Sequence, residues 1–106
     1  MDIEPKLRAL EQDFMETERR MSDPAVASDP KELQTLGKRR AQLEPVVEKY
    51  REYRATLAGI EEARELLKAG DPEMEALARD ELDALEPKIE GFTDELKRLL
   101  LPRDPN

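Results

Sequence analysis

The chain has 106 residues, of which 42% are charged and 4% aromatic, and it contains neither cysteine nor histidine. This composition is typical of exposed helices that meet along narrow seams, and it excludes disulfide scaffolds and sites built on thiolate or imidazole groups. The net charge of −8 disfavours non-specific binding to nucleic acid or to anionic membranes and favours a basic partner.

The first predicted helix covers residues 3–21. Its apolar residues recur at steps of three, four and seven, which is the period of one helix face. They are Ile3, Leu7, Leu10, Phe14 and Met21. Asp2 or Glu4 can cap this helix. A Ser-Asp-Pro sequence follows, so we expect residues 22–29 to form a loop with at most one helical turn.

A long central helix is predicted over residues 30–69, and the other segments must be arranged along it. Asp29 is a favourable N-cap, Pro30 suits the first helical position, and Glu32 can complete a capping box. Gly70 can adopt the left-handed conformation that ends a helix. The apolar positions that define its seam are Leu33, Leu36, Leu43, Val47, Tyr50, Leu57, Ile60 and Leu67.

Two prolines fall inside predicted helices, Pro45 in the central helix and Pro87 in the helix that follows. Each lies two residues from an apolar position on either side, so each points away from the seam. We therefore expect each proline to bend its helix without breaking it. The alternative is that residues 30–43 and 46–69 are separate helices.

A third helix is predicted over residues 72–100, after a tight Gly-Asp-Pro connection. Its apolar positions are Met74, Leu77, Leu82, Leu85, Ile89, Phe92, Leu96 and Leu99. The short connection forces this helix to run antiparallel to the central one. By length, the first and third helices overlap along the central helix only near residues 42–49.

The predicted fold is all-α, an elongated antiparallel three-helix bundle or coiled coil with a long central helix. Residues 1–101 form this helical domain, and residues 102–106 form a linker. The exposed helix ends also allow a dimer.

No catalytic, metal or cofactor constellation is found in the sequence, because carboxylate pairs are frequent on solvated helix faces and no glycine-rich phosphate loop occurs. The basic run 38–40 either contacts phosphate or pairs with acidic neighbours such as Glu44, and we favour pairing. Tyr50 and Tyr53 form either a binding patch or part of the packed seam, and we favour packing.

The last eight residues read LLLPRDPN. They resemble the segment that closes the N-terminal helical domain, domain 1, of the bacterial peptide chain release factor 1 family. Residues 21–26 resemble the first loop of that domain, and residues 71–74 resemble the start of its third helix. Residues 36–47 are also similar to the sister family, release factor 2, but the tail favours the first.

The resemblance implies domain 1 of a class-I release factor, which acts in translation termination at UAA and UAG stop codons. The codon-reading loop and the Gly-Gly-Gln loop of that family are absent from these 106 residues. The resemblance therefore implies no enzyme activity and no cofactor for this chain by itself. It implies docking at the ribosomal stalk base and a link to the GTPase that recycles release factors.

Without an apolar run that resembles a signal peptide or a membrane span, the sequence predicts a cytoplasmic protein with no membrane partner. It also shows no direct nucleic-acid site. A different class of function stays open, namely a free-standing acidic coiled-coil adaptor or oligomerisation module.

The leucine run near the C-terminus needs more than one neighbour. A helix seam uses one or two of three successive leucines, so another leucine fills a three-helix zone or packs on a domain that follows. If the leucine packs on a domain that follows, we predict an interdomain junction with a missing catalytic core. Its residues are Leu100, Leu101, Pro102, Arg103 and Asp104.

Overall fold

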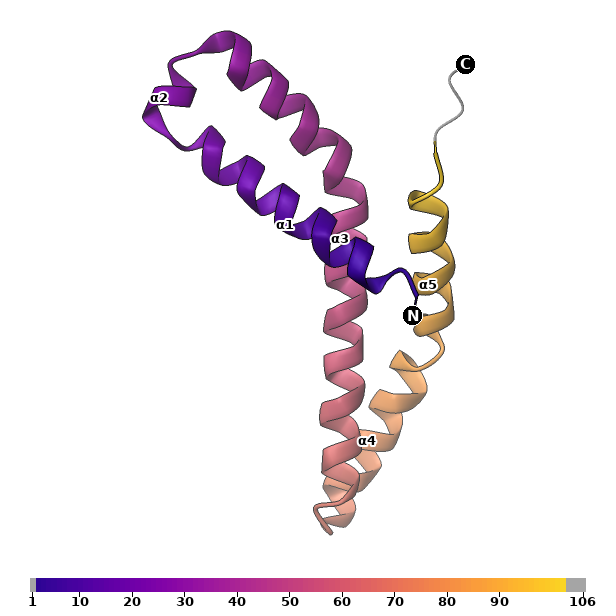
Figure 1. The fold of residues 1–106 in the computed structure, drawn as a ribbon. Coiled ribbons are helices and arrows are strands. Elements are labelled where there is room, and N and C mark those ends of the chain that lie inside the picture. Colours follow the sequence, from indigo (N-terminus) through magenta and orange to yellow (C-terminus); the bar gives the residue numbers. More distant parts are fainter. Residues whose placement is uncertain (1, 103–106) are drawn as a thin grey trace. The chain divides into compact units, whose positions relative to one another are not determined.

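The computed structural model describes residues 2–102, and every regular element within them is a helix (Figure 1). The helices are α1 (Glu4–Met21), α2 (Pro24–Ala27), α3 (Pro30–Leu67), α4 (Pro72–Leu85) and α5 (Lys88–Leu99). The prediction of an all-α fold with a long central helix is confirmed. The chain divides between Glu48 and Lys49 into two compact units, and α3 contributes to both.

The ends of α3 follow the local chemistry of the sequence. The Asp29 carboxylate accepts hydrogen bonds from the backbone N–H groups of Lys31 and Glu32, at 3.1 and 3.2 Å. These bonds satisfy two N–H groups that have no partner inside the helix. At the other end, Gly70 has a φ of 78°. The predicted cap and terminating glycine are confirmed, although the helix ends at Leu67.

Two other capping predictions are wrong. Helix α1 begins after Ile3, and no side-chain hydrogen bond caps it, so neither Asp2 nor Glu4 has that role. The Glu32 carboxylate accepts a hydrogen bond from Arg20 of α1, and the capping box is not formed. A charge-assisted bond to a guanidinium is stronger than a bond to a neutral N–H, which explains why Glu32 turns toward α1.

The two prolines behave differently. Pro45 is exposed within a continuous α3, so the alternative of two separate helices is wrong, and a bend at Pro45 stays a prediction. Pro87 does break its helix, because α4 ends at Leu85 and α5 begins at Lys88. The single helix predicted over residues 72–100 is therefore wrong. Proline has no N–H to donate, and its ring clashes with the preceding turn. The chain relieves that conflict by starting a new helix directly after Pro87.

In the first unit, α1 runs antiparallel to the first part of α3. Ion pairs join Glu32 of α3 to Arg20 and Arg40 to Glu18, so residue numbers rise along α3 as they fall along α1. The Arg40 guanidinium also pairs with Glu44 at 2.6 Å and lies 5.0 Å from the ring centroid of Phe14. The predicted pairing with Glu44 is thus confirmed for Arg40 of the basic run. The buried apolar side chains of this unit are Leu7, Phe14, Leu36, Leu43, Val46 and Val47.

In the second unit, the remainder of α3 runs antiparallel to α4 and α5. Lys49 pairs with Glu95 at 3.4 Å, and the Tyr53 ring meets Phe92 edge-on with centroids 6.4 Å apart. Tyr50 and Tyr53 are 1% and 7% exposed, which confirms that they pack inside the protein. A hydrogen bond from the Lys49 ammonium to Glu52 raises the pKa of Lys49, and Glu95 adds to this effect. A short three-helix zone shared by α1 and α5 stays a prediction.

The buried side of the second unit differs from the predicted seam. Leu57, Met74 and Leu77 were expected in the seam, but they are 36%, 44% and 62% exposed. Ala63 and Ala78 are buried instead, at 2% and 1% exposure. Each residue of a helix is rotated about 100° from the one before it, so burying Ala78 turns its neighbour Leu77 toward solvent. Small side chains at the contact allow the two helices to approach closely.

The glycines of α3 provide a test of this close approach. A Cβ atom added at Gly37 meets nothing within 4 Å, whereas one added at Gly59 would lie 2.9 Å from Cδ1 of Leu85. We expect Gly37→Ala to raise the free energy of unfolding by about 1 kcal/mol, through helix propensity alone. Gly59→Ala should gain less, because Leu85 must move. Urea denaturation followed by circular dichroism measures both, and equal gains would show that α4 does not lie close to Gly59.

Candidate protein-interaction surface

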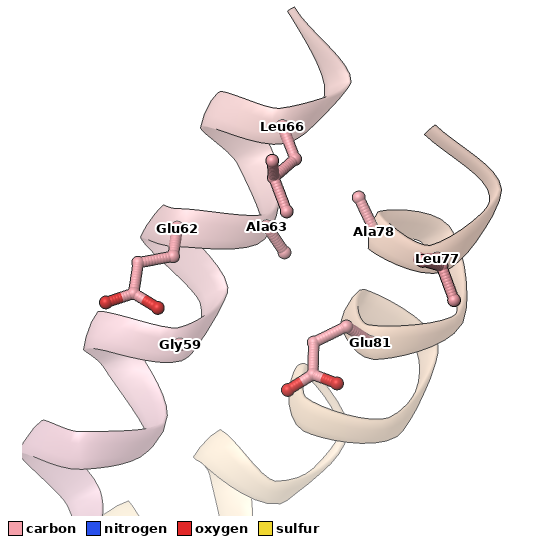
Figure 2. Close-up of a pocket in the computed structure, with 7 residues that line it drawn as sticks. All are labelled: Gly59, Glu62, Ala63, Leu66, Leu77, Ala78 and Glu81. Atoms are coloured by element: carbon pink, nitrogen blue, oxygen red, sulfur yellow. The ribbon is translucent and has the colours of Figure 1, made fainter. Parts of the chain in front are cut away.

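A groove of about 210 Å³ lies between α3 and α4 in the second unit (Figure 2). It is lined by Gly59, Glu62, Ala63 and Leu66 of α3 and by Leu77, Ala78 and Glu81 of α4. Figure 2 shows Ala63 and Leu66 facing Ala78 across the space, with Glu81 extending between the helices. This space is open to solvent, so aliphatic side chains of a partner can enter it. We call this feature the α3–α4 groove.

The groove combines a floor of small residues with large apolar residues at its rim. Ala63 and Ala78 are almost fully buried, and Gly59, where an added Cβ would meet Leu85, contributes no side chain to the lining. Leu66 and Leu77 stand beside this floor and are 40% and 62% exposed. Exposed leucines are ordinary when they are scattered singly, but leucines gathered at a concave site are typical of an interaction surface.

Most of the net negative charge of the chain belongs to the segment that forms this groove. Residues 59–86, which we call the acidic end, contain ten acidic and three basic residues, giving −7 of the total net charge of −8. The three basic residues are already within 4 Å of carboxylates, in the pairs Arg64–Glu86, Lys68–Glu65 and Arg79–Glu75. Within residues 2–102, Glu62 and Glu81 have no ion-pair partner. Glu62 and Glu81 therefore give the lining of the groove an uncompensated negative charge.

The predicted interdomain junction is only partly described. Leu100 is half-buried and donates its backbone N–H to the carbonyl of Leu96 at 3.1 Å, as a continuation of α5. Leu101 is 66% exposed, and Pro102 is exposed as well. Arg103 and Asp104 lie outside the described residues. Leu101 is thus available to a neighbour beyond the seam, and the junction itself stays a prediction.

The groove was not among the sites predicted from the sequence, although one signal for it was present. The three basic residues of the acidic end are outnumbered by ten acidic ones, and this imbalance is visible without a structure. The outward orientation of Leu77 could not be seen in the sequence, because the periodicity of apolar residues placed Leu77 in the seam. Among the described residues, no three carboxylates are arranged to hold a metal ion. None of the described helices has the length and apolar character needed to cross a membrane.

Comparison with known proteins identifies the family. The model of the PCRF domain matches residues 10–106, which is most of the chain and includes the groove. The chain belongs to the PCRF domain family. Its relatives include proteins named peptide chain release factor 1. The protein from Caldicellulosiruptor bescii is 43% identical over 102 residues, covering 95% of this chain and 29% of the relative.

Two further relatives carry the same name. The protein from Finegoldia magna is 48% identical over 94 residues, covering 88% of this chain and 26% of the relative. The protein from Streptococcus equi subsp. equi is 40% identical over 108 residues, covering 100% of this chain and 30% of the relative. This PCRF domain thus spans less than a third of the length of these relatives. The resemblance seen in the tail and loops is confirmed. No solved structure matches the chain.

The orientation of α4 in this PCRF domain can be tested with two neighbouring residues. We expect Leu77→Ser to change the free energy of unfolding by less than about 0.5 kcal/mol, because Leu77 is largely exposed. Ala78→Leu should cost about 1–3 kcal/mol, because the added atoms have no space against α3. Urea denaturation of both variants measures the difference. If Leu77→Ser were the more destabilising change, Leu77 would belong to the seam.

Proposed function

We propose that this chain is the N-terminal helical domain of a class-I peptide chain release factor and acts in translation termination on the ribosome. The observation that carries the proposal is its 43% identity, over 102 residues, to a protein named peptide chain release factor 1. Membership of the PCRF domain family supports it independently. On this proposal the protein works in the cytoplasm.

In this function the domain positions the factor and performs no chemistry of its own. Its 106 residues contain no two consecutive glycines, so the Gly-Gly-Gln loop of the release factor family lies elsewhere in the longer protein. Codon reading at UAA and UAG likewise belongs to the rest of that protein. The residues from Leu100 to Asp104 join the helical domain to the remaining domains, and the exposed side chain of Leu101 supports this role.

Docking takes place at the ribosomal stalk base, close to the site of the GTPase that recycles release factors. The acidic end supports this part of the proposal, because its charge of −7 complements basic ribosomal proteins and repels the phosphates of ribosomal RNA. The second candidate is an acidic oligomerisation module. Three exposed leucines of the second unit, Leu57, Leu66 and Leu77, favour it, since they can pack on another copy.

Co-sedimentation with ribosomes separates the two candidates. We expect this chain to bind intact ribosomes at low salt and to be displaced by an intact release factor 1. Moderate salt should weaken binding, because exposed charges are screened within about 10 Å at 0.1 M ionic strength. Ribosomes depleted of stalk-base proteins are the matched control and should bind at least about tenfold more weakly.

Equal binding to intact and depleted ribosomes would contradict docking at the stalk base. A stable dimer by light scattering, without ribosome binding, would favour the oligomerisation module. The codon assignment has its own test in the longer protein that carries this domain. Peptide release in a purified system should occur at UAA and UAG, and release at UGA would contradict the assignment.

A further inference from the structure

We propose that the α3–α4 groove binds a basic amphipathic helix of a partner protein, whose aliphatic side chains enter between Leu66 and Leu77. The inference rests on the proposed function as a docking domain, and it adds the surface used and the chemistry of the partner. The groove, the exposed leucines beside it and the distribution of charge carry the inference together.

The shape of the groove favours a helix as the occupant. Its walls are two antiparallel helices, and its floor consists of the small residues Gly59, Ala63 and Ala78 (Figure 2). A third helix laid along such a groove inserts side chains at i, i+3, i+4 and i+7 between the walls. Leu66 and Leu77 then lose the solvent exposure that the described structure leaves them. Binding thus buries the two exposed leucines beside a floor whose alanines are already packed.

The charge around the groove selects a basic partner. Glu62 and Glu81 line the groove itself, and the acidic end carries −7 of the net charge in only 28 residues. The rest of the chain, with the first unit and α5, has a net charge of −1. Lysine or arginine residues flanking the apolar face of a partner helix would meet these carboxylates. A second copy of this chain is disfavoured, because two acidic ends repel each other.

A peptide titration monitored by NMR tests the inference directly. The probe is a synthetic helix of leucine and lysine, with leucines at i, i+3, i+4 and i+7, added to the isotope-labelled 106-residue chain. We expect amide shifts in the acidic end and none in α1. A scrambled peptide of the same composition lacks the apolar face. It should bind about tenfold more weakly, and a version with glutamate in place of lysine should not bind.

Matched variants separate the apolar and the charged contributions. Leu77→Ser should weaken binding of the leucine–lysine peptide by about tenfold. The matched control is Met15→Ser, which also replaces an exposed apolar side chain by serine but lies on α1. Met15 is 49% exposed, and its replacement should leave peptide binding unchanged. The double variant Glu62→Gln and Glu81→Gln should reduce the salt dependence of binding. The exposed Glu48→Gln is its control. Circular dichroism confirms that each variant is folded.

Several outcomes would overturn the inference. Equal affinity of the scrambled peptide would show that only net charge matters, and shifts spread over α1 would show that no defined groove is used. Dimerisation through Leu66 and Leu77 would identify a second copy as the occupant. If the Leu77→Ser variant no longer bound the leucine–lysine peptide but still bound ribosomes, the groove would not be the surface that docks on the ribosome. The proposed function would then stand without it. Peptide binding without ribosome binding would refute the proposed function instead.

Discussion

The antiparallel packing of shorter helices against α3 is the interaction on which the rest of the structure depends. Most of the stability of a helix in a protein comes from the packing of its apolar face, so α3, from Pro30 to Leu67, depends on the seam that it buries. That seam includes Val47 and Tyr50, which are each 1% exposed. Because 42% of its residues are charged, the chain has few apolar side chains beyond those of this seam. Its helices therefore pack in narrow pairs and form no broad core.

The sequence predicted best those features that a few neighbouring residues determine. Asp29 and Gly70 were predicted to begin and end the central helix, and each does so through its own hydrogen bonds or backbone geometry. The break at Pro87 was missed because Pro45 and Pro87 have the same local pattern, so the pattern alone cannot tell a tolerated proline from a disruptive one. That difference depends on the helix surrounding each residue, which local spacing does not describe.

The candidate surface was missed for a related reason. Periodicity ranks residues by hydrophobicity, and that rule assigns Leu77 to the seam and ignores Ala78. In the structure the small residue is buried, because Gly59 and Ala63 on α3 allow α4 to approach closely only where its own side chain is small. The preferred contact is thus decided by the fit between two helices, whereas amphipathicity is a property of each helix separately. The concentration of acidic residues, by contrast, required no knowledge of packing.

The two surfaces proposed for the second unit are separated by its own topology. The α3–α4 groove lies near the turn at Gly70, whereas α5 returns along α3 until Glu95 pairs with Lys49 at the start of the unit. Leu101 directly follows α5, and Figure 1 shows the C-terminal end of α5 away from the turn that joins α3 to α4. A partner in the groove and a domain following Leu101 would not compete for the same surface. This separation is what a domain needs if it is to hold a longer factor at one end and a docking partner at the other.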